Sequence, residues 1–467
     1  MFLIEYKFAL PYNSLGMEKE TTERNIMGYE SIPKLVLKIS TPLMLAMLVQ
    51  ALYNIVDSIF VAMLSEKALT AVSLAFPLQN LLIAFAIGTS VGTNSFLARK
   101  LGAGDRESAE KTAGNGLFLA LCTWLVFVLI GIFGAERFLS LFTDDSELLA
   151  LATTYSKIVL IGSFGIFIDI MVERILQGTG DSIHPMITQM CGAIANIILD
   201  PIFIFVFDMG IAGAAIATIT GQIASMFLAI YYVRKNKFIK VRIRKIRPDK
   251  AIIKSIYDVG VPTIITNSIG TIMTSLMNSI LIAFSATAVS VFGVYFKLNS
   301  FIFMPVFGLT SGMVPIVAYN YGAKNKDRMI KTIKFGASIA VALMALGTVI
   351  FQLFPDALLS LFSASDEMLA IGVPALKVIS LHFVIAAFSI SLMTSFQATG
   401  IGFASMIVSI SRQLVVLIPS AWILGRVGGL NYVWYSFILA EIASVILCST
   451  FFCWVYKHKI KPLGATV

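Results

Sequence analysis

Apolar stretches long enough to cross a lipid bilayer recur along almost the whole chain. A transmembrane helix needs about 20 predominantly apolar residues. The 467 residues are 58% hydrophobic and 13% charged, whereas soluble domains average about 45–50% apolar and about 25% charged residues. This composition excludes a soluble protein and predicts an all-α polytopic membrane protein. Twelve spans are expected, near residues 35–62, 71–98, 113–133, 155–176, 184–207, 210–233, 255–284, 288–318, 333–354, 374–396, 404–424 and 432–456.

Charge alternates in sign from one connection between the spans to the next. The segment 234–250 carries nine Lys or Arg residues against one Asp. Such a run can bind nucleic acid, but between apolar spans it is typical of a cytoplasmic loop. The second and eighth connections and the tail are also basic, while the third and ninth are acidic. The pattern predicts a multi-pass plasma-membrane protein with both termini in the cytoplasm and no nucleic-acid partner.

The two halves of the chain repeat one another. LSLFTDDSE at 139–147 aligns with LSLFSASDE at 359–367, and QGTG at 177–180 aligns with QATG at 397–400, both at an offset of 220 residues (359 against 139). Each half holds six spans, so both halves have the same orientation, as in transporters with parallel repeats. The predicted organisation is an N-terminal cytoplasmic segment (1–32, with the biological start at Met1 or Met17), a first lobe (33–233), a basic linker (234–254), a second lobe (255–456) and a cytoplasmic tail (457–467).

Nucleotide-binding and metalloprotease motifs are absent from the sequence. There is no G-x-x-x-x-G-K-[ST] loop, no H-E-x-x-H and no Cys/His spacing typical of a metal site. We therefore expect no enzyme, no nucleotide partner and no cofactor. Uphill transport would then draw on an ion gradient, which requires ionisable groups inside the membrane.

Four polar residues of the first half are predicted to share one depth in the membrane. Asp57 lies about seven residues before the outer end of span one, Asp200 about eight before that of span five, and Thr218 about eight after the outer start of span six. With a rise of 1.5 Å per residue, these depths are roughly 10–12 Å. Asn196 lies one turn before Asp200 on the same helix face.

This set of residues suits a coupling ion. Two carboxylates close together in a low-dielectric medium do not both ionise readily, so the pair can hold a proton. With the Asn and Thr oxygens added, the set is equally suited to Na⁺, and Pro201 can free a backbone carbonyl at the same place. The structural alternative is that Asp200 caps a bend and Asp57 hydrogen-bonds a neighbouring helix. The predicted cation-coupling set, for H⁺ or Na⁺, is Asp57, Asn196, Asp200 and Thr218.

Other polar residues in the predicted spans are candidates for substrate contact or secondary coupling. Asp169 and Glu173 share a helix face, but an ion pair or snorkelling at the cytoplasmic end, where Arg174 also lies, explains them equally well. Lys297 can touch substrate or balance a carboxylate, and Glu441 can pair with a polar neighbour. The secondary candidates are Gln50, Asn54, Asp169, Glu173, Asn278 and Lys297.

These residues lie in stretches that resemble the multidrug and toxic compound extrusion (MATE) family, over about residues 33–457. The similar stretches are VDSIFVAMLSEKALTAVSLAFP, GTSVGTNSFLARKLGAGD, QGTGD, NIILDPIFIFVFDMGIAGAAIAT and FKLNSFIFMPVFGLTSGMVPIVAYNYGAKN. LDPIFIF resembles the DinF and MepA-like branches, whose first-lobe cation site uses an Asp, an Asn, an Asp and a Thr that correspond to Asp57, Asn196, Asp200 and Thr218. The NorM branch has further acids in spans seven and ten. Here Asn278 stands in the span-seven region and 374–396 holds no acid, so no cation site is expected in the second lobe.

The resemblance implies two six-helix lobes around a V-shaped cavity. It also implies export of small organic, often cationic, compounds in exchange for H⁺ or Na⁺. We therefore expect a monomeric secondary antiporter in the lipid bilayer, working by alternating access of its lobes. The alternatives are a lipid-linked precursor flippase of related architecture, a membrane-embedded enzyme or receptor, and a duplicated scaffold without a transport role.

Overall fold

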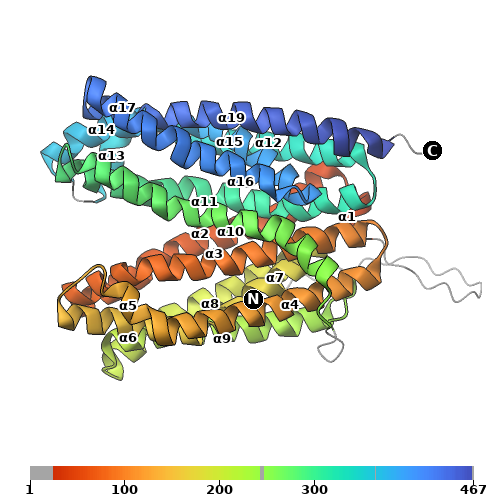
Figure 1. Ribbon diagram of the computed structural model, residues 1–467, viewed down its shortest axis with the longest axis horizontal. Coiled ribbons are helices and arrows are strands. Elements are labelled where there is room, and N and C mark those ends of the chain that lie inside the picture. Colours follow the sequence, from red (N-terminus) through yellow and green to blue (C-terminus); the bar gives the residue numbers. More distant parts are fainter. Residues whose placement is uncertain (1–24, 242–246, 363, 465–467) are drawn as a thin grey trace, which may run out of the picture.

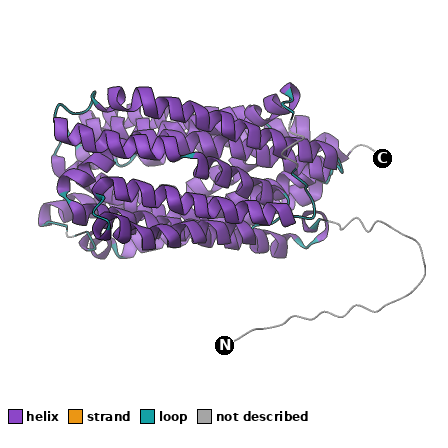
Figure 2. Ribbon diagram, turned by 90° about the horizontal axis from the view of Figure 1, so that it is seen from below, coloured by secondary structure: helices purple, strands orange, loops and turns teal. Residues whose placement is uncertain are grey.

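The computed structural model describes residues 25–241, 247–362 and 364–464, so the question of a start at Met1 or Met17 and part of the basic linker lie outside it. The described residues form helices and loops, without a strand (Figure 2). In chain order the α-helices are α1 (Ile26–Tyr29), α2 (Ile32–Leu64), α3 (Glu66–Gly102), α4 (Arg106–Leu129), α5 (Ala135–Leu139), α6 (Ser146–Gly162), α7 (Phe164–Gly178), α8 (Ile183–Pro201), α9 (Gly210–Lys235), α10 (Lys250–Leu281), α11 (Ala286–Gly322), α12 (Lys326–Leu353), α13 (Pro355–Ser360), α14 (Asp366–Ser380), α15 (His382–Thr399), α16 (Gly402–Ile410), α17 (Ile418–Gly428), α18 (Leu430–Val433) and α19 (Ser436–Val455). Within the described residues, these helices are interrupted or extended by π-helical segments and a 3₁₀ turn, namely η1 (Ile130–Gly134), η2 (Ile202–Val206), η4 (Ser411–Leu417), η5 (Tyr456–Ile460) and the 3₁₀ turn η6 (Lys461–Gly464).

The sequence repeat reappears in the residues that begin the helices. Ser65 before α3 and Ser285 before α11 each accept a hydrogen bond from the amide three residues further on, both at 3.0 Å. Asp105 before α4 and Asn325 before α12 cap their helices in the same way. A side chain that accepts from the first turn satisfies one of the free amides of a helix start. The repeat is therefore retained where it determines the ends of helices.

Eleven helical segments of the described chain are long and apolar enough to cross a membrane. Ten of them match predicted spans directly, and the eleventh, His382–Thr399, covers only part of the tenth predicted span (374–396), which is divided between α14 and α15. The fourth span is likewise divided, between α6 and α7. The break in the fourth span falls at Ser163, whose hydroxyl donates to the carbonyl of Leu160 (2.6 Å). At the adjacent Gly162, a Cβ atom would lie 2.2 Å from Cδ1 of Ile219 in α9. A Gly-Ser pair pressed by a neighbouring helix is a usual place for a helix to be interrupted.

The helices form two bundles, with α3–α9 in one and α10–α19 in the other (Figure 1). Helix α2 runs along the seam between them and packs against α8 of the first bundle and α11 of the second. We call the end with connections 103–105 and 323–325 the basic end, and the end with connections 140–145 and 361–365 the acidic end. Both α1 and the C-terminal η6 lie at the basic end, on the right of Figure 1.

At the basic end the bundles meet through a reciprocal pair of glycines. A Cβ atom on Gly102 of α3 would lie 1.8 Å from the carbonyl oxygen of Tyr319 in α11, and one on Gly322 of α11 would lie 1.9 Å from the carbonyl oxygen of Arg99 in α3. Residues 102 and 322 are equivalent positions of the repeat, as are 99 and 319. Because glycine lacks a Cβ atom, the two backbones can approach this closely. The molecule is thus closed at its basic end.

Replacing Gly102 by Ala is expected to separate the bundles at the basic end. The added methyl group would overlap the Tyr319 carbonyl, and overpacking of this kind costs about 1–3 kcal/mol, enough to shift a two-state equilibrium about 5–150-fold. The measurement is the distance between spin labels on the exposed Lys111 and Lys334, which should lengthen. Gly293→Ala is the matched control, because nothing lies within 4 Å of a Cβ atom there. An unchanged distance distribution in the Gly102 variant would contradict the prediction.

The stretch Gly88–Gly92 reads GTSVG, which matches the G-x-S-x-G spacing of a hydrolase nucleophile elbow. That motif requires a strand, a sharp turn and a helix. Here the stretch lies inside the continuous helix α3, where the hydroxyl of Ser90 donates to the carbonyl of Ile87 (2.9 Å). A Cβ atom on Gly92 would lie 2.1 Å from the carbonyl oxygen of Ile256 in α10. The glycines therefore serve packing across the seam.

Candidate functional site

Three helices bring the four predicted coupling residues together. Asp57 lies on α2, Asn196 and Asp200 on α8, and Thr218 on α9, and α8 packs against both of the other helices. The side-chain amide of Asn196 donates to Asp200 Oδ1 and to Thr218 Oγ1, each at 3.3 Å. The carboxyl groups of Asp57 and Asp200 lie close enough to interact electrostatically. We call these four residues the acid site.

Asp200 lies where α8 changes into the π-helix η2. The next residue, Pro201, has no amide hydrogen, so a carbonyl of the preceding turn loses its helical partner. Short π-helical segments within α-helices are frequent at functional sites. The local sequence therefore places a fully buried carboxyl group, with 0% of Asp200 exposed, beside a disturbed stretch of backbone. Asp57 itself is only half-buried.

Two oxygen atoms of the acid site have no hydrogen-bond donor in the described part of the chain. Among the described residues, Asp200 Oδ2 and Asn196 Oδ1 are buried without a protein donor. Ionised carboxylates only accept hydrogen bonds, so a bond between Asp57 and Asp200 requires one proton. Carboxylate, amide and hydroxyl oxygens are also ligands that suit hard cations. A buried oxygen left without a partner costs free energy, and either H⁺ or Na⁺ would remove that cost.

Two tyrosines complete the surroundings of the acid site. Tyr53 lies one turn before Asp57 on the same face of α2 and is close enough to Asp57 and Asp200 to interact with them electrostatically. Tyr155 of α6 accepts from the amide of Gln79 in α3 (3.0 Å) and lies close enough to Asp57 to interact electrostatically. The spacing of four residues to Asp57 is a signal that could have identified Tyr53. No sequence pattern pointed to Tyr155, since it comes from another helix.

The positions equivalent to the acid site in the second half carry no carboxylate. At the offset of the repeat they are Met277, Val416, Ser420 and Ile438. Only one of these side chains offers an oxygen atom. The two bundles thus share a helical framework, but only the first carries carboxylates at these positions.

A family model described as MatE matches residues 42–202 and again residues 262–423. The two matches together cover more than half of the chain. They begin 220 residues apart (262 against 42), which is the offset of the sequence repeat. This chain belongs to the MatE family.

Relatives of this MatE chain match it over nearly its whole length. The multidrug export protein MepA of Staphylococcus haemolyticus is 29% identical over 420 residues, which are 89% of this chain and 92% of the relative. MepA of Staphylococcus saprophyticus is 28% identical over 413 residues, with 88% and 91% covered. A solved structure described as the outward-facing conformation of a multidrug resistance MATE family transporter has a TM-score of 0.89 at 28% identity, covering 96% of this chain and 100% of that chain. The predicted MATE resemblance and the fold of two six-helix lobes are confirmed.

A second buried acidic cluster of this MatE protein lies between α7, α8 and α9. Glu173 accepts from the hydroxyl of Thr188 (2.8 Å) and from the amide of Gln189 (3.0 Å), and Asp169 accepts from Ser225 (2.7 Å). Only 3% of Glu173 and 8% of Asp169 is exposed, so neither side chain snorkels. Among the described residues, no ion pair joins Glu173 to its neighbour in sequence. Both structural explanations offered for these acids from the sequence are therefore wrong, because hydrogen bonds from α8 and α9 hold them instead.

Replacing Glu173 by Ala is expected to lower the free energy of unfolding by about 1–3 kcal/mol, because a buried donor is left without an acceptor. The loss should fall mainly on Gln189, since the hydroxyl of Thr188 also reaches the carbonyl of Pro185 (2.8 Å). The measurement is the midpoint of thermal unfolding in detergent. Glu107→Ala is the control, because its ion pair with Lys111 is exposed and worth about 0–1 kcal/mol. Equal midpoints for the two variants would contradict the assignment.

The remaining candidates make no hydrogen bond to the acid site in the described part of the chain. Gln50 donates to Asn54 Oδ1 (3.2 Å) along α2, and Asn54 is exposed. The Asn278 side chain makes no hydrogen bond in the described part of the chain. Lys297 is exposed and lies over the ring of Phe362 (5.8 Å). Among the described residues no carboxylate pairs with Lys297, so the expectation that it balances one is wrong.

The second bundle holds a buried ion pair that the sequence did not predict as a pair. Glu441 of α19 accepts from Arg412 of the π-helix η4 (3.3 Å). Only 2% of Glu441 is exposed, and its Oε1 atom has no donor among the described residues. Glu441 can pair with a polar neighbour, as the sequence suggested, and that neighbour is the positively charged Arg412.

Proposed function

We propose that this MatE protein is a secondary antiporter that exports small organic, often cationic, compounds in exchange for H⁺ or Na⁺. The observation that carries the proposal is the acid site, where two carboxyl groups lie close together beside buried oxygen atoms that have no donor among the described residues. The MepA relatives, which are multidrug export proteins, support the class of substrate. We further propose a monomer in the plasma membrane with its basic end in the cytoplasm, in keeping with the distribution of Lys and Arg.

Helix α2 provides a physical link between the ion and the seam. It runs without interruption from Ile32 to Leu64 and carries Asp57 in its acidic-end half. In its basic-end half, Ser40 donates to the carbonyl of Leu309 in α11 (3.1 Å), and a Cβ atom on Gly308 would lie 2.6 Å from the Cα atom of Met44. Loading or release of a cation changes the charge at Asp57, and a displacement of this helix would then alter the contact with α11. Alternating access of the two lobes follows from such a coupling.

The decisive experiment is transport by the purified protein in proteoliposomes with an imposed pH or Na⁺ gradient. We expect accumulation of ethidium, a fluorescent organic cation, to require one of the two gradients and to collapse when an ionophore dissipates it. The gradient that supports accumulation identifies the coupling ion.

Other outcomes of the same experiment distinguish the alternatives. A lipid-linked precursor flippase would translocate a labelled polyprenyl-phosphate lipid between leaflets without accumulating ethidium. If neither gradient moves any compound in a panel of organic cations, the antiport proposal is wrong.

A further inference from the structure

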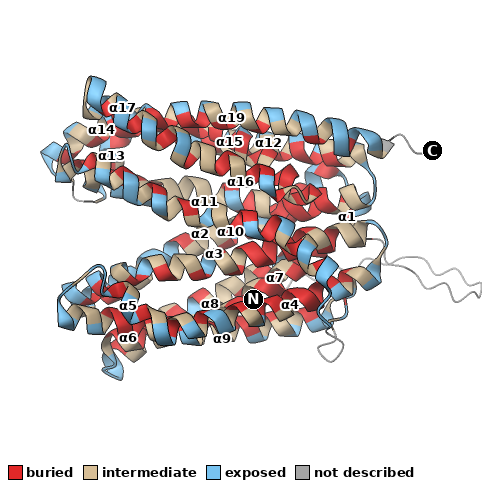
Figure 3. Ribbon diagram, viewed as in Figure 1, coloured by how far each residue is buried: buried red, intermediate tan, exposed pale blue. Residues whose placement is uncertain are grey.

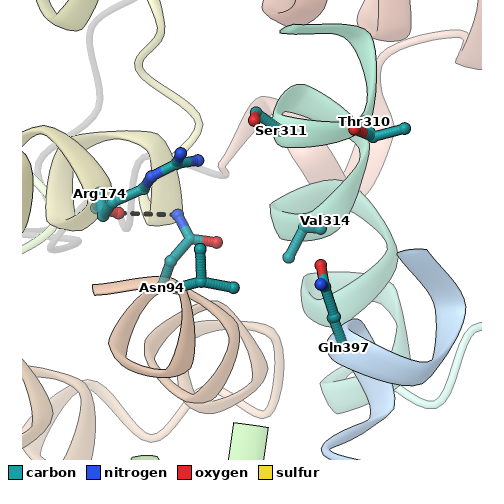
Figure 4. Close-up of a pocket in the computed structure, with 7 residues that line it drawn as sticks. Asn94, Arg174, Thr310, Ser311, Val314 and Gln397 are labelled. Carbon is teal, nitrogen blue, oxygen red and sulfur yellow. Dashed lines mark hydrogen bonds between the residues drawn. The ribbon is translucent and has the colours of Figure 1, made fainter. Parts of the chain in front are cut away.

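A small cavity lies between the two bundles, on the basic-end side of the seam. The first bundle contributes Val91 and Asn94 of α3 and Arg174 of α7. The second contributes Thr310, Ser311 and Val314 of α11 and Gln397 of α15, and the cavity measures about 50 Å³. Figure 4 shows the guanidinium group of Arg174 extending from α7 toward α11. The cavity is therefore a place where a positively charged group of one bundle faces hydroxyl and amide groups of the other.

The charge of Arg174 is not matched by an acid in the cavity. Its only side-chain hydrogen bond in the described chain runs from Nη1 to Gln177 Oε1 (3.0 Å). Glu173 precedes it, but both carboxylate oxygens of Glu173 already accept from α8, and no Asp or Glu lines the cavity. The backbone of Arg174 is held in place, because Asn94 donates to its carbonyl (2.7 Å), as the dashed line in Figure 4 marks. An Arg inside a membrane protein normally has a partner.

The opposite wall of the cavity offers further hydrogen-bond donors. The hydroxyl of Ser311 and the side-chain amide of Gln397 make no hydrogen bond among the described residues, whereas the hydroxyl of Thr310 donates to the carbonyl of Phe307 (3.0 Å). Ser311 and Gln397 can thus donate into the cavity at the same time as Arg174. Three donors converge from two bundles, and the only full charge among them is positive.

Equivalent positions of the two halves line the cavity, but its only charged side chain comes from the first bundle. Val91 and Ser311 are equivalent positions of the repeat, as are Asn94 and Val314. The position equivalent to Arg174 is Thr394, which has no charge. An anion in the cavity would be attracted by Arg174 of the first bundle and would accept hydrogen bonds from Ser311 and Gln397 of the second. It would therefore join the two bundles.

We propose that this cavity binds a small monovalent anion of the size of chloride, and that the anion holds the bundles together at the basic end. A cavity holds one water molecule when about 10–15 Å³ is open to the centre of a water-sized sphere, so about 50 Å³ has room for a chloride ion together with some of its water. Drug-sized ligands occupy pockets of about 300–1,000 Å³, so the cavity suits a small ion rather than a transported organic compound. Guanidinium, hydroxyl and amide donors are the groups that bind anions most strongly in a dry site.

The test is thermal unfolding of the purified full-length protein while chloride replaces gluconate at constant ionic strength. We expect a saturable rise of the midpoint by about 2 °C or more, because a ligand that binds the folded state stabilises it by mass action. Bromide should act like chloride, and phosphate should not. Spin labels on Lys111 and Lys334 should show a narrower distance distribution in chloride. Neither measurement requires transport, so a failure of the antiport proposal would leave the result readable.

Variants decide whether the cavity is the site. Arg174→Gln should lose the chloride response, and Ser311→Ala should raise the chloride concentration at half-effect about tenfold, since one hydrogen bond to an anion is worth about 1.4 kcal/mol or more. Arg137→Gln, which removes an exposed charge at the acidic end, should respond like the wild type. If Arg174→Gln does not fold, Gln397→Leu takes its place, with the same weakening expected as for Ser311→Ala. A midpoint unaffected by chloride, equal effects of phosphate and chloride, or an unchanged response in the cavity variants would overturn the proposal in favour of water alone in the cavity.

Discussion

Asp200→Asn is expected to lower gradient-driven accumulation of an organic cation in proteoliposomes at least about tenfold, which corresponds to about 1.4 kcal/mol of lost coupling free energy. Asn keeps the size of the side chain and can still accept the hydrogen bond from Asn196. It cannot take up or release a proton, and it lacks the charge that would attract Na⁺. The variant should therefore still bind ethidium at equilibrium, measured by fluorescence, while accumulation is lost. Asp57→Asn should act in the same direction, because both carboxyl groups belong to the proposed cation site.

A matched control lies further along the chain. Asp208 is exposed just beyond η2 and has a φ of 53°, a left-handed conformation that Asn adopts readily. Asp208→Asn removes the same charge by the same chemical change and should transport like the wild type. If Asp200→Asn accumulated ethidium at the wild-type level under both gradients, the acid site would have only the structural role of capping the bend in α8.

The second large effect is expected for stability in the other bundle. Glu441→Leu should lower the free energy of unfolding by about 3 kcal/mol, the lower end of the range for a buried pair, because it leaves the half-buried Arg412 charge without its partner. The pair is separated by 3.3 Å, and 24% of the Arg412 side chain is exposed. The midpoint of thermal or denaturant unfolding in detergent measures the loss.

Removing both charges should restore most of that stability. In Arg412→Met with Glu441→Leu neither side chain is charged, and replacing a buried ion pair by apolar residues of similar size is often neutral or stabilising. The double-mutant cycle then reports the interaction between the two residues. Arg137→Met, at an exposed position, should change stability by less than about 0.5 kcal/mol. A single variant as stable as the double variant would show that the pair does not constrain the bundle.

The positions of the spans could be predicted because lipid solvation imposes a long and uniform pattern. The first span was expected at 35–62 and is observed as Ile32–Leu64. The break in the fourth span could not be predicted. Gly162 and Ser163 are compatible with a continuous helix, and the interruption depends on Ile219 of α9 pressing against them. The span pattern does not encode contacts between helices, and such a contact determines whether the helix continues or breaks at this point.

The four residues of the acid site could be located because the rise of an α-helix is fixed, so distance from a span end is a measure of depth. Depth does not say which way a helix faces. Tyr155 and Arg412 were missed for that reason, since their contacts with the acid site and with Glu441 depend on how separate helices pack. For the same reason the sequence could not choose between the two interpretations of Lys297, whose helix places it over an aromatic ring.

The reciprocal glycine contact at the basic end has the form of an isologous interface, in which one patch meets its own copy across a two-fold axis. Two separate half-length chains could make the same contact, Gly102 on Tyr319 and its equivalent in return. The second half of this protein is then physically a tethered subunit, and the linker maintains a high local concentration of it. Such an arrangement constrains the residues that touch across the axis while leaving the rest of each half free to specialise. One half could acquire two carboxylates for an ion, and the other an ion pair for its own stability, without disturbing the surface that joins them.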